Sequence, residues 1–191
     1  MGKSRLEAFS DGVIAVIITI IVLEFKVPRD PDLAGLAELA PTFFSYVLSF
    51  VYVGIYWNNH HHMLHTVQRV NGAILWANLH LLFWLSLVPF ATAWMAEHRF
   101  AAWPTLVYGV VLLLSAIAYI ILQAAVIRLH GRDSTLATAV RRDLKGKISV
   151  VCYVAGIALA LRDPRIALGL YVLVACIWFI PDRRIERVVS G

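Results

Sequence analysis

The sequence predicts an all-α protein that crosses a membrane several times, and three observations lead to that fold class. Hydrophobic residues make up 60% of the 191 residues, and charged residues only 15%, against about 25% in soluble domains. Mean hydropathy is +0.75. The apolar residues gather in runs of roughly 20, the length that a helix needs to cross a bilayer. This composition excludes a disordered chain and a soluble domain, which could not hide so much apolar surface.

Six apolar runs predict six transmembrane helices in a single domain over residues 1–191. They lie at about 6–27, 42–64, 71–95, 104–127, 147–162 and 165–181. The last two runs are short and only residues 162–165 connect them, so we expect a tight helical hairpin. The first run does not resemble a cleaved signal peptide, because no small-residue cleavage site follows it and Asp11 and Glu24 lie within it.

The distribution of positive charge predicts that both termini are cytoplasmic. With the N-terminus inside, twelve of the 17 Lys and Arg residues fall on the inner side, in agreement with the positive-inside rule. The outer connector 24–41 is acidic and proline-bearing, and we expect an ordered loop. The basic connector 128–147 contains a helix-like stretch over 134–145, which predicts an amphipathic segment at the cytoplasmic surface. Cys152 and Cys176 lie within apolar runs and are interpreted as small buried hydrophobes.

Asp11 is the unusual residue of the first run, because an ionisable side chain inside a membrane helix is costly and indicates a functional site. Arg5 is the simplest partner, but six residues correspond to about 600° of rotation, so the two side chains point about 120° apart. A partner on another helix is therefore expected. The alternative is a helix-end carboxylate that reaches the headgroups, which the helix dipole would favour.

Val16, Ile20 and Leu23 follow one another at i, i+4 and i+7, with Thr19 beside them, and form one stripe of the first helix. On spacing alone, this stripe is typical of a surface that faces lipid or packs against another helix. The functional interpretation is an aliphatic ring, repeated by symmetry around an axis, that gates a pore by dewetting.

A histidine cluster ends the second run, in the stretch Trp57–His65. His61 and His65 are at i, i+4 and could share a zinc ion, although no carboxylate lies within this helix. A bis-histidine haem is a further alternative, and a hydrogen-bonded structural role is the expectation for each single histidine. The predicted topology brings this cluster close to Arg5 and Asp11, and to Asn71 and Asn78 of the third run, so that a buried carboxylate would find donors.

The stretch Tyr52–Val53–Gly54–Ile55–Tyr56 is similar to the carbonyl-lined filter of ordinary potassium channels, but it lacks the threonine and the second glycine. It also lies within a predicted helix, without a preceding pore helix. We therefore interpret it as ordinary helix, and the sequence predicts neither that filter nor its pore helix.

The first three runs resemble the transmembrane protein 175 family, which comprises lysosomal potassium channels of animals and shorter prokaryotic relatives. The resemblance rests on Arg5–x–x–x–Phe9–Ser10–Asp11 at the start of the first run. The pattern Trp57–x–x–His60–His61, followed by Asn71 and then Pro89–Phe90, is similar to the same family. For runs four to six, only length and hydropathy agree.

The resemblance implies six helices per subunit and a homotetramer with a pore lined by four copies of the first helix. It places the hydrophobic constriction at Val16, Ile20 and Leu23, and a hydroxyl layer involved in cation preference at Thr19. Signature residues would tie the first helix to its neighbours: Arg5, Phe9, Ser10, Asp11, Trp57, His60, His61 and Asn71. The expected function is a potassium-preferring cation channel of the prokaryotic cell membrane, with K⁺ as the permeant ion and no cofactor.

Two other functions compete with the channel. A metal or proton-coupled transporter could use the His60–His65 cluster with Asp11, but the inverted repeats and broken helices that are common in transporters are not evident. An intramembrane enzyme or haem protein lacks a Ser/His or paired-carboxylate arrangement in the sequence. We therefore expect a protein that is not an enzyme and holds no metal, with His61 and His65 as the weak metal alternative.

Overall fold

The computed structural model describes residues 2–28, 31–131, 133–140 and 144–179, and within these ranges it contains helices and no strands. The all-α prediction is therefore confirmed. The helices are α1 (Lys3–Val22), α2 (Leu33–Glu38), α3 (Ala40–His65), α4 (Gly72–Ser86), α5 (Val88–Glu97), α6 (Ala102–His130), α7 (Thr135–Val140), α8 (Leu144–Ala160) and α9 (Pro164–Phe179).

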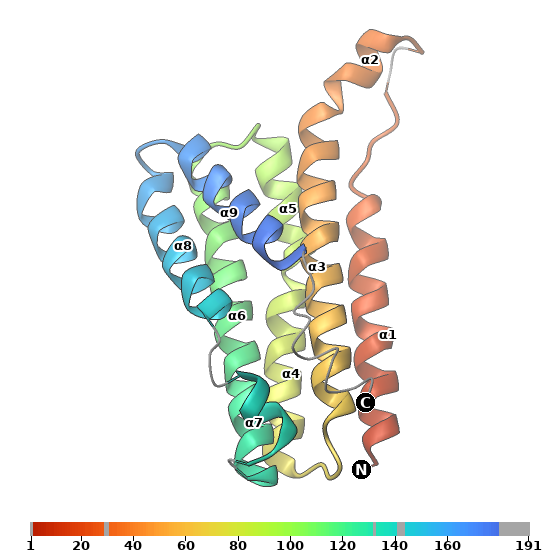
Figure 1. Cartoon of the computed structure of the whole chain (residues 1–191). Coiled ribbons are helices and arrows are strands. Elements are labelled where there is room, and N and C mark those ends of the chain that lie inside the picture. The colour runs from red at the N-terminus through yellow and green to blue at the C-terminus, as the bar shows by residue number, and fades with distance from the viewer. Residues whose placement is uncertain (1, 29–30, 132, 141–143, 180–191) are drawn as a thin grey trace.

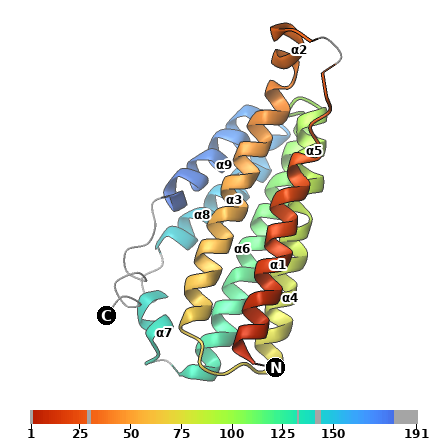
Figure 2. The ribbon, with the colours of Figure 1, turned by 90° about the vertical axis from the view of Figure 1, so that its right-hand side faces the viewer.

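The long helices lie side by side, and a shorter hairpin covers one flank of them (Figure 1). Helix α1 packs against α3, α4 and α5, while α6 packs against α4, α5 and α8. The α8–α9 hairpin lies on α6 and α3. Figure 2 shows α1 at the front of the bundle, with α2 projecting at one end and α7 at the other. Helix α1 thus lies at an edge of the helical bundle and contacts other helices on one side only.

The helices form a multi-pass membrane protein, as the apolar runs predict. Within the described ranges, three segments are long and apolar enough to span a bilayer: Ala40–His65, Gly72–Glu97 and Ala102–His130. Helices α8 and α9 have 17 and 16 residues, which gives each a length of roughly 25 Å, short of the ~30 Å hydrocarbon core. The count of six spans and the cytoplasmic termini stay predictions. Among the basic residues that predict this orientation, Arg29, Arg132, Arg141, Arg142, Arg183, Arg184 and Arg187 lie outside the described residues.

The helix predicted over 71–95 is not continuous, and this is a correction to the sequence analysis. Helix α4 ends at Ser86 and α5 begins at Val88, with Leu87 as the junction. Pro89 is the physical reason, because it has no N–H to donate to the carbonyl of Leu85 and its ring crowds that carbonyl. Both halves keep the same course, so the break shifts the backbone without ending the span (Figure 2).

Smaller differences concern the connectors. Helix α1 ends at Val22, five residues before the predicted end, and Leu23 is its C-cap. The 24–41 connector contains the short helix α2, which begins where Asp32 Oδ1 accepts a hydrogen bond of 2.9 Å from Gly35 N. The helix-like stretch predicted over 134–145 is helical over Thr135–Val140, and α8 begins at Leu144. Residues 141–143 between them lie outside the described residues.

Two glycines let the α8–α9 hairpin approach α6 closely. The ring of Tyr171 on α9 lies against the backbone of Gly109 on α6 and Gly156 on α8. A Cβ atom at Gly156 would lie 2.5 Å from Cε1 of Tyr171, which is closer than real contacts allow. A side chain at either glycine would therefore push the hairpin away from the body of the subunit.

We expect Gly156→Ala to destabilise the protein by about 1–3 kcal/mol, the usual cost of overpacking a filled interior. Gly169→Ala is the matched control on α9, since a Cβ there meets no atom within 4 Å. The difference in melting temperature between the two purified variants is measured by heating samples and recording, by size-exclusion chromatography, how much folded protein remains. Equal melting temperatures for the two variants would show that Tyr171 does not fill the space that the structure gives it.

Candidate functional site

Helix α1 has one face buried in the helical bundle and one face exposed on its surface. Leu6, Ser10, Ile14, Ile17 and Ile21 are buried on the inner face. On the outer face, Val16, Ile20 and Leu23 are 54%, 41% and 75% exposed. Both faces are apolar, so amphipathicity does not explain the arrangement. The outer face could contact lipid or another protein chain, or it could line a pore.

Thr19 lies on this outer face and is also exposed. Its Oγ1 atom is 3.0 Å from the carbonyl oxygens of both Ala15 and Val16, to which it can donate its one hydrogen. The hydroxyl oxygen keeps lone pairs after this donation. Thr19 therefore offers an oxygen acceptor on a face that is otherwise aliphatic.

A groove accompanies the outer face of α1. It runs between α1 and α5, has a volume of about 1080 Å³, and is bordered by Phe9, Val16 and Ile20 on one side and by Phe90 and Trp94 on the other. Its side chains are mostly apolar. A helix or an acyl chain from outside the bundle could fill the apolar part of such a groove.

Behind the outer face, a buried chain of hydrogen bonds joins α1, α4 and α3. Asn78 Nδ2 donates to Ser10 Oγ over 2.9 Å, and Asn78 Oδ1 lies 2.7 Å from His60 Nε2. Because an amide oxygen only accepts, Nε2 of His60 carries the proton. Ser10 in turn donates to Leu6 O over 2.8 Å. All three side chains are at most 1% exposed, so this chain fixes how α1 sits against its two neighbours.

A second set of contacts between α1 and α3 is more exposed than this buried chain. Trp57 Nε1 donates to Asp11 Oδ1 over 3.1 Å, so Asp11 has a partner on another helix, α3. The ring of His61 stacks on Trp57, with 6.1 Å between the ring centroids. At the start of α1, Lys3 Nζ donates to His65 O over 3.1 Å. The histidine-rich end of α3 thus contacts α1 at several levels.

Three of the predicted signature residues do not join this network. Arg5 and Phe9 are exposed, and within the described residues no ion pair involves Arg5. Asn71 instead caps helix α4, where its Oδ1 accepts from Ile74 N over 3.0 Å. Asn78 is the central member of the buried hydrogen-bond chain, although the family resemblance did not place it among the signature residues. The sequence feature that could have singled out Asn78 is a polar amide side chain within an apolar run.

A second buried polar cluster was not anticipated from the sequence. Ser49 on α3 lies 2.6 Å from the hydroxyl of Thr92 on α5 and 3.0 Å from that of Tyr108 on α6. Thr92 also donates to Val88 O over 2.6 Å. Hydroxyl groups in three apolar runs were the only signal, and such residues are common in membrane helices. The cluster joins α3 to α5 just beyond the helix break.

Among the described residues, few potential metal ligands lie close together. In the part of the chain that it describes, no three His, Cys, Asp or Glu side chains come together in a way that could hold a metal ion. The rings of His61 and His65 are neighbours, with centroids 5.3 Å apart, but they form only a pair. Structural zinc sites normally use four ligands.

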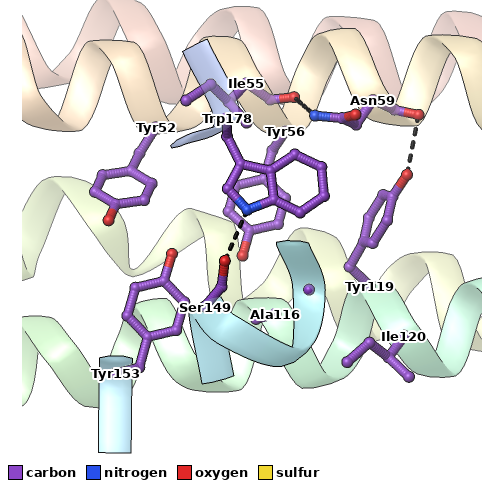
Figure 3. A pocket seen from close by; sticks show the side chains of 11 residues that line it. Tyr52, Ile55, Tyr56, Asn59, Ala116, Tyr119, Ile120, Ser149, Tyr153 and Trp178 are labelled. Atoms are coloured by element: carbon purple, nitrogen blue, oxygen red, sulfur yellow. Dashed lines mark hydrogen bonds between the residues drawn. The ribbon is translucent and has the colours of Figure 1, made fainter. Parts of the chain in front are cut away.

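A small cavity of about 50 Å³ lies between α3, α6 and the α8–α9 hairpin, and five aromatic side chains contribute to its walls (Figure 3). Two of the polar side chains at its border are hydrogen-bonded. Tyr119 OH donates to Asn59 O over 3.1 Å, and Trp178 Nε1 donates to Ser149 Oγ over 2.8 Å. The cavity is far smaller than the groove beside α1, and we interpret it as a packing space under the hairpin.

These features define a class of protein, a multi-pass helical membrane protein with one helix at the edge of its bundle. Hydrogen bonds anchor the inner face of this helix, and its exposed face is aliphatic. Comparison with known proteins identifies the family. The model of the family described as "Endosomal/lysosomal potassium channel TMEM175" matches residues 5–89. A potassium channel of Chryseobacterium sp. (strain P1-3) is 57% identical over 187 residues, which is 98% of this chain and 97% of that protein. The chain belongs to the TMEM175 family, and the resemblance seen in the sequence is confirmed.

Two further relatives define how far the similarity extends. The crystal structure of a lysosomal potassium-selective channel TMEM175 homolog from Chamaesiphon minutus matches with a TM-score of 0.81 and 28% identity, over 93% of this chain and 96% of that chain. The human endosomal/lysosomal proton channel TMEM175 is 33% identical over 86 residues, but these cover only 39% of this chain and 17% of the human protein. The family and these relatives are ion channels and not enzymes.

Proposed function

We propose that four copies of this chain form a potassium-preferring cation channel in the cell membrane, with the pore lined by α1. The observation that carries the proposal is the exposed aliphatic face of α1, backed by a buried polar chain. The hydrogen bonds on the inner side fix the rotation of α1, so that the same aliphatic face always points away from the bundle. The bacterial relatives named as potassium channels and the potassium-selective structural neighbour support the choice of ion.

The exposed face of α1 and the membership of the TMEM175 family support our proposal that several copies assemble. A single α1 cannot enclose an ion path, whereas copies related by a closed rotational symmetry place identical faces around one axis. The groove between α1 and α5 offers each subunit an apolar surface for a neighbour. We expect native mass spectrometry of the purified protein to give the mass of four chains. A stable monomer would contradict the shared pore.

In this arrangement, rings of Val16, Ile20 and Leu23 form a hydrophobic constriction, and water leaves a narrow aliphatic ring readily. Thr19 lies between them and offers its oxygen to a partly dehydrated cation. The Asp11–Trp57 hydrogen bond and the hydrogen bonds that link Ser10, Asn78 and His60 hold α1 in place. None of these side chains touches the ion. Conduction is downhill and needs no cofactor.

We expect Thr19→Val to lower the preference for potassium over sodium by a factor of roughly five, equivalent to about 1 kcal/mol for one lost oxygen contact. Valine keeps the shape of threonine and removes only the hydroxyl. Thr42→Val, at the start of α3, is the matched control. Permeability ratios from liposome flux measure the effect, and an unchanged ratio in Thr19→Val would remove Thr19 from the ion path.

A proton permeability is the second candidate, because animal relatives are named proton channels. The same liposomes, loaded with a pH-sensitive dye, measure it. Proton flux without potassium flux would replace the proposed ion. Potassium flux that requires an opposing proton gradient would instead revive the coupled transporter that uses His60–His65 and Asp11.

A further inference from the structure

A second groove lies between α4 and α6, with a volume of about 550 Å³, and it shares no lining residue with the groove beside α1. Ala73 and Ala77 of α4 and Ala124 and Ala125 of α6 form its floor and walls. Since alanine side chains are short, two helices that are packed together leave an open trough along their line of contact. The trough is apolar and lies on the surface of a membrane protein, where lipid chains are the solvent.

The groove has a cationic end. Arg128 borders it in the last turns of α6, close to where α4 begins, and its side chain is exposed. Among the residues that the structure describes, no carboxylate forms an ion pair with Arg128. A guanidinium group binds phosphate through two parallel hydrogen bonds, and it is the side chain best suited to this task.

Trp76 stands beside the groove and is 76% exposed. An exposed tryptophan near the end of a membrane helix is typical of the headgroup level, where its ring contacts lipid. The deep end of the groove is marked by His80 and Ile121. His80 Nε2 already accepts from Trp84 Nε1 over 2.8 Å, so that nitrogen is not left unpaired against lipid chains.

The depth of the groove suits one leaflet. Arg128 and Ile121 are seven residues apart on α6, which corresponds to roughly 10 Å along the helix. One leaflet contributes about half of the ~30 Å hydrocarbon core. A phosphate at Arg128 would therefore place the first part of an acyl chain along the alanines, within the same leaflet.

We propose that this groove binds an anionic phospholipid, with the phosphate on Arg128 and an acyl chain in the alanine trough. Basic pockets between transmembrane helices on the cytoplasmic side are known to hold anionic headgroups. The charge distribution predicts that the end of the bundle that carries Arg128 is cytoplasmic. The site is separate from the α1 face, and it does not depend on which ion the protein conducts.

Native mass spectrometry of the full-length protein, with phosphatidylglycerol or phosphatidylcholine of identical chains added in detergent, tests the proposal. We expect phosphatidylglycerol to be retained in preference to phosphatidylcholine. Arg128→Gln should lower that retention about fivefold, the factor that corresponds to ~1 kcal/mol for one basic residue near an anionic headgroup. Arg99→Gln, an exposed arginine at the opposite end of the bundle, is the control and should retain the lipid.

A second variant tests the apolar part of the site without changing its charge. Ala124→Leu fills the trough and should reduce phosphatidylglycerol retention while leaving the number of chains per particle unchanged. Equal retention of the two lipids, or full retention by Arg128→Gln, would overturn the proposal. A change in the number of chains in Ala124→Leu would also overturn it, because the groove would then be a contact between subunits.

Discussion

Asn78→Leu, on α4 against the inner side of α1, should destabilise the protein strongly. Leucine has the same branched shape but is bulkier, and it neither donates to Ser10 Oγ nor accepts from His60 Nε2. Both partners would stay buried without it, and each unsatisfied buried group costs about 1–3 kcal/mol. We expect a large loss of folded protein on expression and a lower melting temperature for the fraction that remains.

Asn58→Leu is the matched control, since Asn58 is half-buried on α3, two residues before His60. Thermal unfolding of both variants in the same detergent, with the yield after size-exclusion chromatography, separates the two positions. If Asn78→Leu unfolded at the same temperature as Asn58→Leu, the buried chain would not be what fixes α1 against α3 and α4.

Val16→Asn should increase potassium flux at least about tenfold, which corresponds to ~1.4 kcal/mol of barrier. The physical reason is wetting: an amide at the narrow ring holds water where an aliphatic side chain expels it. Because Val16 is exposed, the longer polar side chain does not disturb the packing inside the helical bundle. Flux per amount of reconstituted protein, with a potassium-sensitive dye in liposomes, measures the change.

Val172→Asn provides the comparison for this variant. Val172 is also an exposed valine, at 43%, but it lies on α9, away from α1. Its replacement should leave potassium flux unchanged. Equal flux in the wild type and Val16→Asn would show that the outer face of α1 is a lipid contact, the alternative that spacing alone leaves open.

The helices could be predicted from the sequence because a bilayer leaves few solutions. A chain cannot leave backbone groups unpaired in lipid, so a long apolar run becomes a helix. The break at Leu87 shows the limit of this reasoning, since hydropathy runs through residues 71–95 without interruption while Pro89 acts on the backbone. Hydropathy alone does not reveal a helix break that a proline causes within an apolar run.

The site was predicted in part for a similar reason. Helical rotation indicated that Asp11 needs a partner on another helix, and the structure gives Trp57. The predicted topology also brought Asn78 close to the histidine cluster, and Asn78 does contact His60. Which side chains then bond to one another depends on helix crossing angles, which the sequence does not give. The central place of Asn78, and the cluster of Ser49, Thr92 and Tyr108, therefore appear only in the structure.

The most direct measurement is ion flux into liposomes that contain the purified protein, first under a potassium gradient and then under an equal sodium gradient. If α1 lines a potassium-preferring pore, potassium enters faster than sodium, without a second ion gradient and without added zinc, and Thr19→Val narrows the difference. Equal entry of both ions, or entry of protons alone, into liposomes whose protein is shown to be assembled would contradict that pore.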